Sequence, residues 1–262
     1  MRKPLSALIA AFVLAGCAGI ESRPDAEARA ALAPTGKLRV GLYTGNPLSV
    51  VQDAASGERN GVAFELGREL AKRLGVEFQP VIYPSVGAVL DASEAAQWDV
   101  AFFLVNPERV KGVDFTAPIV ELELGYLVSA GSRVSSLAEM DRPGMRIAVA
   151  DKGQADVLLS RSLRQATLVR APGLAAVVQR VKAGQADAIA ANKTILHELS
   201  AQIPGARILD GRFAVERVAM AIPKSAARGM PFAERFIAEA KAQGLIAAAA
   251  QRAGARGAVV AP

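Results

Sequence analysis

The sequence has very little of what most catalytic and metal centres require. Its 262 residues include one cysteine, Cys17, and one histidine, His197. A single cysteine excludes a disulfide within the chain, and a lone histidine cannot complete the usual zinc ligand set. No Gly-x-Ser-x-Gly elbow is present, and Gly41, Gly45 and Gly61 are isolated rather than arranged as a phosphate-binding loop. We therefore expect no metal, no cofactor and no catalytic triad.

Aromatic residues are also scarce, at 5% of the chain, and the excess of positive charge is modest, at +6. The sequence has no cluster of lysine and arginine with interleaved aromatic residues, which is the pattern typical of nucleic-acid binding. A small positive excess instead suits anionic small ligands or a membrane surface. We expect no nucleic-acid partner.

The first 16 residues have the pattern of a lipoprotein export signal. Arg2 and Lys3 precede an apolar run over residues 5–15, which is too short to span a membrane, and Leu-Ala-Gly directly precedes Cys17. We expect Cys17 to be the lipidated first residue of a periplasmic protein, anchored to the inner or outer membrane. The alternative is a small apolar residue within an ordinary signal peptide. Loss of Arg2 and Lys3 would lower the formal charge from +6 to +4.

Residues 17–35 are polar and alanine-rich, which predicts a tether with some helical content. Beyond it, strand-like and helix-like segments alternate, and this alternation predicts an α/β fold with mostly parallel sheets flanked by helices. We expect strands at residues 37–43, 76–83, 98–105, 145–150, 167–170 and 188–190, and helices at 62–74, 155–163 and 174–183.

The two halves of the chain share a pattern. Residues 184–190 (GQADAIA) resemble residues 96–102 (AQWDVAF), so that each half has a helix, a Gln-x-Asp turn and a buried strand. This predicts two lobes of similar construction, although chance similarity of two βαβ units is an alternative. Asp99 and Asp187 precede their strands at the end away from the expected cleft, which indicates structural rather than acid–base roles. Trp98, at the start of its strand, is expected in the core.

The most informative stretch is residues 98–120, WDVAFFLVNPERVKGVDFTAPIV. An apolar strand ends at Asn106, which with Pro107 and Glu108 has the pattern of a helix start. Arg109 in the first turn would oppose the helix dipole at a cost of about 0.3–1 kcal/mol. Its position therefore suggests a role other than stabilising the helix. A guanidinium beside free turn amides can hold a carboxylate through two parallel hydrogen bonds. The alternative is a surface arginine paired with a nearby carboxylate.

These residues resemble a known family, the solute-binding proteins of amino-acid ABC transporters (bacterial extracellular solute-binding protein family 3). The resemblance rests on GKLRVGLY, GVAFELGRELAKRLGVEF, NPERVKGVDFTAP, GQADAIAANKTIL and VAMAIPKS, and covers roughly residues 36–225. It implies the two-lobed periplasmic-binding-protein fold of type II, with two hinge strands near residues 123–129 and 214–218. Lobe 1 would comprise residues 36–124 and 219–262, and lobe 2 residues 125–218.

The resemblance also implies a function. The chain would be a monomeric, non-enzymatic receptor that captures a small amino acid or related carboxylate between its lobes and presents it to an ABC permease in the inner membrane. Arg109 matches the arginine that clamps the ligand carboxylate. The other positions implied to line the pocket are Tyr43, Asn46, Phe102, Leu104, Gln154 and Asn192.

One departure affects the expected ligand. Where amino-acid binders of the family carry an acidic residue for the ligand ammonium, this chain has Asn192. Losing that charge should weaken ammonium binding by about 1.5–3 kcal/mol, and bulky Phe102 and Leu104 further reduce polar contacts. We therefore expect a small carboxylate or amino-acid derivative rather than a standard amino acid.

Two other functions stay open from sequence. A periplasmic dehydratase on the same scaffold would need an acid or base facing the cleft, and its candidates are Glu65, Glu121 and Glu123. A sensory or accessory module with degenerate ligand binding is consistent with Asn192 and the apolar pocket positions.

Overall fold

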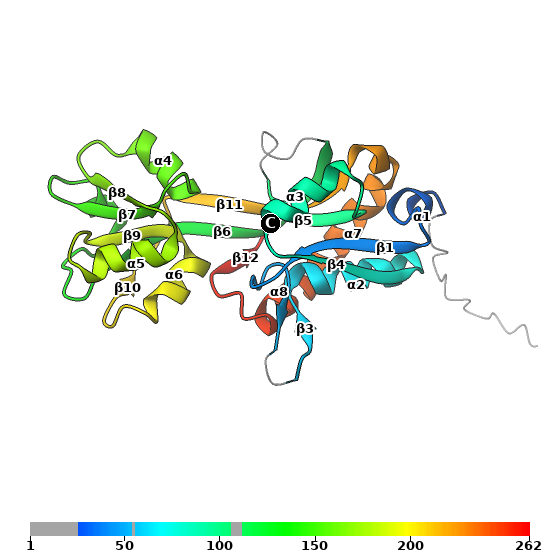
Figure 1. The fold of residues 1–262 in the computed structure, drawn as a ribbon, viewed down its shortest axis with the longest axis horizontal. Helices are drawn as coiled ribbons and strands as arrows, with labels where there is room; N and C mark the ends of the chain where they lie inside the picture. The colour runs from blue at the N-terminus through cyan, green and yellow to red at the C-terminus, as the bar shows by residue number, and fades with distance from the viewer. Residues whose placement is uncertain (1–25, 54–55, 106–111) are drawn as a thin grey trace, which may run out of the picture.

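The computed structural model describes residues 26–53, 56–105 and 112–262, which form two α/β lobes joined by two long strands (Figure 1). The strand order β4-β1-β5-β11-β6-β9-β7-β8 runs through both lobes as one sheet. Parallel strands form the outer part of the sheet in each lobe. The antiparallel strands β11 and β6 lie at the centre of the whole sheet. The two-lobed α/β fold expected from the sequence is confirmed.

Lobe 1 contains a parallel sheet covered on both faces. Strand β1 (Lys37–Tyr43) pairs with β4 (Glu77–Tyr83) and with β5 (Val100–Leu104). Helix α2 (Val62–Leu74) packs against one face, and α3 (Val86–Glu94) packs against the other. The short strands β2 (Val51–Gln52) and β3 (Arg59–Asn60) form a hairpin, and α7 (Met230–Ala242) and α8 (Leu245–Arg252) complete the lobe.

Lobe 2 repeats this plan. Strand β7 (Arg146–Ala150) pairs in parallel with β8 (Thr167–Ala171) and β9 (Ala188–Asn192). Helix α4 (Gln154–Ser162) covers one face, and α5 (Leu174–Lys182) with α6 (Lys193–Ser200) covers the other. A short 3₁₀ helix, η1 (Leu137–Met140), and β10 (Arg207–Ile208) lie at the margins.

Matching ion pairs support the internal repeat. In lobe 1, Asp99 accepts hydrogen bonds from the backbone N–H of Arg39 (2.8 Å) and from two of its guanidinium nitrogens (3.1 and 2.6 Å). In lobe 2, Asp187 accepts the same three bonds from Arg146, at 2.9, 3.1 and 2.7 Å. Each carboxylate therefore ties two neighbouring strands together, and the structural role predicted for Asp99 and Asp187 is confirmed.

Two strands connect the lobes. Strand β6 (Val113–Val128) pairs with β11 (Ala214–Pro223) over much of its length and with β9 over its last residues. Core residues from Ala28 to Leu122 pack with those from Val218 onward, whereas those between Leu124 and Ala214 form separate clusters in lobe 2. The predicted bounds, residues 36–124 with 219–262 for lobe 1 and residues 125–218 for lobe 2, fall close to this change of cluster and stay a prediction.

Two terminal segments add contacts to this framework. Helix α1 (Ala26–Leu32) packs against the 3₁₀ helix η2 (Lys224–Gly229), with Ala28 and Leu32 buried, so the chain is already part of lobe 1 within the segment expected to be a tether. At the other end, β12 (Ala258–Val260) pairs with residues 120–122 of β6.

The part of the chain that the structure describes contains no helix long and apolar enough to cross a bilayer. Nor does this part contain a group of three or more histidine, cysteine or acidic side chains placed to hold a metal ion.

Candidate functional site

One candidate site is a cavity of about 390 Å³ between the lobes. The carboxyl ends of the parallel strands meet here, which is where open α/β sheets bind their ligands. Three kinds of segment contribute to it: strand ends and α3 of lobe 1, the loop before α4 in lobe 2, and the connecting strand β11. The described lining residues are Tyr43, Val86, Leu90, Phe103, Leu104, Val105, Lys152, Gly153, Gln154, Val215, Glu216 and Arg217.

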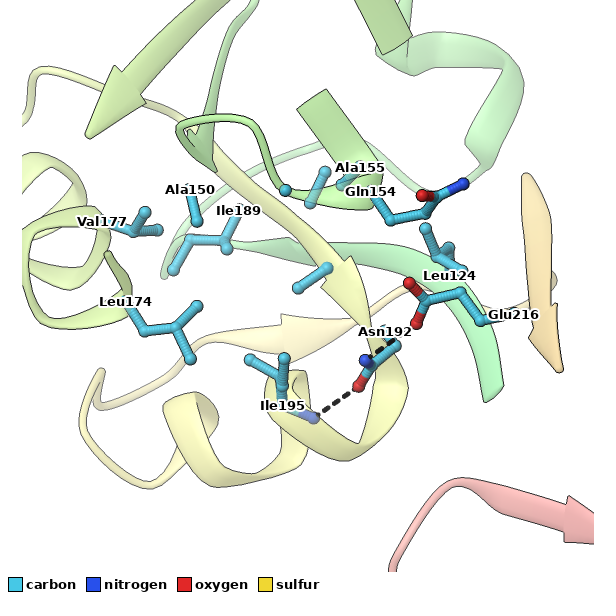
Figure 2. A pocket seen from close by; sticks show the side chains of 13 residues that line it. Leu124, Ala150, Gln154, Ala155, Leu174, Val177, Ile189, Asn192, Ile195 and Glu216 are labelled. Carbon is cyan, nitrogen blue, oxygen red and sulfur yellow. Dashed lines mark hydrogen bonds between the residues drawn. The ribbon is translucent and has the colours of Figure 1, made fainter. Parts of the chain in front are cut away.

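A second cavity, of about 100 Å³, extends into lobe 2 (Figure 2). Its walls are mostly apolar and come from β7, β9, α4, α5 and α6, with Asn192 at the carboxyl end of β9. Gly153, Gln154 and Glu216 line both cavities. A ligand between the lobes would therefore meet these three residues together.

The structure brings four of the expected pocket residues to these cavities. Tyr43 and Leu104 line the larger one, Gln154 lines both, and Asn192 lines the smaller one. Burial raises the pKa of the Tyr43 hydroxyl, so this side chain stays a neutral hydrogen-bonding group at ordinary pH. That these four residues bind a ligand, as the resemblance implied, stays a prediction.

Two expected residues lie elsewhere. Phe102 is 4% exposed and packs in the lobe 1 core on the side of α2. Its neighbour Phe103, which the sequence analysis did not select, faces α3 and lines the larger cavity, because successive side chains of a strand point to opposite faces. The side-chain oxygen of Asn46 accepts a hydrogen bond from the Leu48 backbone N–H (2.8 Å), which braces the loop after β1.

Arg109 and Cys17 lie outside the residues that the structure describes. The helix start expected at residues 106–108 lies in the same segment as Arg109. The predicted roles of Arg109 and Cys17 therefore stay predictions.

Glu216 is another site residue that the sequence analysis did not select. It lies on β11, and its Oε2 accepts a hydrogen bond from the Nδ2 of Asn192 at 3.1 Å. Burial raises the pKa of Glu216, and the hydrogen bond from Asn192 opposes that shift. A glutamate within an apolar strand (AVERV) is a sequence signal for such a site, but its pairing with Asn192 depends on the fold.

Several other charged groups near the site already have partners. Arg217 pairs with Glu121 (3.0 Å), and Glu123 pairs with Lys193 (2.6 Å) and Arg212 (2.8 Å). These cations lower the pKa of Glu123, chiefly through the hydrogen bond from Lys193. Among the described cationic side chains, none forms an ion pair with Glu216. Glu216 is therefore a half-buried carboxylate that faces the cavity without a counter-charge from this part of the chain.

Two remaining residues from the sequence analysis, Glu65 and Trp98, make contacts that stabilise the fold. Glu65 forms an ion pair with Arg252, so all three carboxylates considered for a dehydratase are paired with cations. Trp98 is 1% exposed and donates from its indole N–H to the Val89 carbonyl (2.9 Å), which confirms its place in the core.

Comparison with known proteins agrees with this geometry. Residues 38–252 match the family described as bacterial extracellular solute-binding proteins, family 3. The glutamine-binding protein of an ABC transporter from Bacillus subtilis is 24% identical over 234 residues, covering 84% of each chain. The glutamine-binding protein of Geobacillus stearothermophilus is 24% identical over 230 residues, covering 81% of this chain and 87% of its own.

A solved structure has the same fold. The putative binding component of an ABC transporter from Wolinella succinogenes, complexed with lysine, is 25% identical and superposes with a TM-score of 0.67. The match covers 83% of this chain and 95% of that one.

Proposed function

The chain belongs to the bacterial extracellular solute-binding proteins of family 3, and on that premise we propose that it captures a small amino acid or related carboxylate for an ABC permease. The observation that carries this proposal is the cavity of about 390 Å³ lined by both lobes and by a connecting strand. Its volume lies in the range of small-molecule sites, about 300–1,000 Å³. A ligand that contacts both walls would favour the closed arrangement of the lobes.

Arg109 is the proposed carboxylate clamp, on the basis of its match to the family motif. Hydrogen bonds to a charged group contribute about 1.5–3 kcal/mol, so Arg109→Ala should weaken binding roughly 10-fold to 100-fold. Isothermal titration of the purified mature protein against amino acids and small carboxylates measures this directly. Arg68→Ala, which removes an exposed arginine from α2, is the matched control. Equal affinity of Arg109→Ala and the control would exclude the clamp.

We propose that no chemistry accompanies binding. The three carboxylates that the sequence analysis considered for a dehydratase are held in ion pairs with Arg252, Arg217, Lys193 and Arg212. Incubation of the protein with a prephenate-like acid should give no product. Turnover that depends on protein concentration would establish the enzymatic alternative.

A sensory module with degenerate binding makes a different prediction. Because a ligand that binds only the folded state raises its melting temperature, a receptor should be stabilised by at least one compound in a broad metabolite panel. Stabilisation by none of them would favour the sensory alternative.

We further propose that Cys17 anchors the protein to a periplasmic membrane face. Cells fed an alkyne-tagged fatty acid should label the native protein and not Cys17→Ser. The variant should move from the membrane fraction to the soluble periplasm. Equal labelling of both proteins would rule out this anchor.

A further inference from the structure

Glu216 and Asn192 form a polar pair at the junction of the two cavities. We propose that this pair is a subsite for a ligand alkylammonium group, with Glu216 as the anionic partner and Asn192 as the residue that positions it. The inference rests on the proposed function and deepens it, because it gives the bound carboxylic acid a second, cationic group.

The first argument is the position of the carboxylate. Glu216 lines both the interlobe cavity and the pocket of lobe 2, and Figure 2 shows its carboxylate beside the Asn192 amide. Its strand, β11, joins the lobes. A group bound to Glu216 would therefore sit at the hinge, within reach of both walls.

The second argument is the missing counter-charge. A carboxylate that is partly removed from water needs a cation or several hydrogen-bond donors. In the described structure Glu216 receives one hydrogen bond, from Asn192, whereas Glu121 and Glu123 of the neighbouring strand are paired with arginine or lysine. The raised pKa of Glu216 reflects the same incomplete compensation. A ligand ammonium would supply both charge and donors.

The third argument is the orientation of Asn192. Its Oδ1 accepts the hydrogen bond from the backbone N–H of Ile195 (3.1 Å) and caps α6, so its Nδ2 is directed at Glu216. An aspartate at this position would place two carboxylates about 3 Å apart, and one of them could not stay ionised. The amide of Asn192 is therefore compatible with an ionised Glu216, whereas a second carboxylate in its place would not be.

This arrangement changes what Asn192 means for the ligand. The loss of an acidic residue at position 192 predicted weaker ammonium binding, but the fold places the carboxylate of Glu216 within 3.1 Å of that amide. In this chain the carboxylate lies on β11, whereas the acidic residue of the family's amino-acid binders would lie at the end of β9. A standard amino acid is thus again compatible with the cavity.

The larger cavity also has groups that suit an anion. Lys152 lies in the loop before α4 and lines the same cavity, and the first-turn amides of α4 have no acceptors within the helix. A molecule with an ammonium at Glu216 and a carboxylate toward lobe 1 or Lys152 matches this distribution of charge. The ammonium could belong to the α-carbon or to the side chain of the ligand.

Titration calorimetry tests the proposal with four proteins: wild type, Glu216→Gln, Asn192→Asp with Glu216→Gln, and the exposed control Glu198→Gln. The probes are the L-amino acids and their deaminated counterparts. We expect Glu216→Gln to lose at least 10-fold in affinity for the amino acid that the wild type binds, whereas the control keeps wild-type affinity. The double variant, which returns the charge to β9, should recover part of the loss. For a deaminated acid that binds the wild type, Glu216→Gln should bind as tightly or more tightly.

If lysine or ornithine is bound, N-acetylation at either nitrogen identifies the ammonium that Glu216 holds. The derivative blocked at that nitrogen should lose affinity for the wild type and should no longer distinguish it from Glu216→Gln. Wild-type binding of an amino acid with unchanged affinity in Glu216→Gln would overturn this inference alone. Failure of the wild type to bind any amino acid or deaminated acid would overturn the proposed function as well.

Discussion

Asp99 and Asp187 make the same hydrogen bonds but differ in how far their side chains are exposed to solvent. The side chains of Asp99 and its partner Arg39 are 4% and 23% exposed, whereas those of Asp187 and Arg146 are 36% and 42% exposed. The internal repeat therefore supplies a comparison in which the geometry is fixed and burial varies.

We expect Asp99→Asn to lower the free energy of unfolding by about 3 kcal/mol, because it leaves a poorly solvated guanidinium without its counter-charge. Asp187→Asn should cost about 1 kcal/mol, since water screens the exposed pair. Urea denaturation of both variants measures the difference. Equal losses would mean that burial does not govern the strength of these pairs.

Glu216 should make the ligand-free protein sensitive to pH in a particular direction. Burial raises its pKa above the ordinary value of 4.5. A raised carboxyl pKa contributes stability below the unfolded-state value, and that contribution is lost as pH rises through the folded-state value.

Glu216→Gln removes this titration. Without ligand, the variant and the wild type should have similar melting temperatures at about pH 4, and the variant should melt higher at about pH 8. Differential scanning calorimetry at both pH values provides the measurement. A difference of the same size at both would contradict the assigned pKa direction.

At the scale of elements, segments with a clear periodic pattern were predicted well. The strand at residues 37–43 and the helix at 62–74 coincide with β1 and α2, and Gly75, in the left-handed conformation, ends α2 where the pattern ends. Helix α3 was given no predicted bounds, since its sequence VGAVLDASE has little amphipathic character. The 16-residue length of β6 was missed, because Pro118 normally interrupts a strand.

The candidate site was predicted less completely because its residues meet only through the tertiary fold. Tyr43, Leu104, Gln154 and Asn192 could be selected from family positions at strand and helix ends. The choice of Phe102 over Phe103 depended on which face of β5 packs against α2, and Glu216 depended on a contact across 24 residues of sequence.

The C-terminal segment gives a prediction at the same scale. Gly257 has φ +78°, and a Cβ there would lie 2.9 Å from Lys193 Cβ and 3.1 Å from the Thr194 backbone nitrogen. Gly254 has φ +69°, and a Cβ there would meet no atom within 4 Å.

Both alanine variants incur the left-handed strain of about 1–2 kcal/mol, and only Gly257→Ala adds a clash with α6. We therefore expect Gly257→Ala to lose more stability in urea and to exchange the amide hydrogens of β12 faster than Gly254→Ala. Similar behaviour of the two variants would show that the contact with α6 contributes little.

For the whole molecule, the connecting strands determine what ligand binding can do. The lobes have separate cores, and β6 and β11 pass between them, so a hinge movement can narrow the cavity without unpacking either core.

Small-angle scattering should show a smaller radius of gyration when the wild type is saturated with a bound amino acid. At the same ligand concentration, Glu216→Gln should stay extended if that concentration is below its dissociation constant. An unchanged radius in the saturated wild type would argue against closure as the response to ligand.

The C-terminal strand has a practical consequence for anyone handling this protein. Strand β12 lies at the middle of the molecule, where the Ala261 N–H donates to the Ile119 carbonyl and Lys241 Nζ donates to the Pro262 carbonyl (Figure 1). A purification tag or fluorescent reporter fused after Pro262 would lie beside the connecting strands and would obstruct the hinge movement of the lobes. Helix α1 enters at the far end of lobe 1, so attachments ahead of Ala26 should leave that motion free.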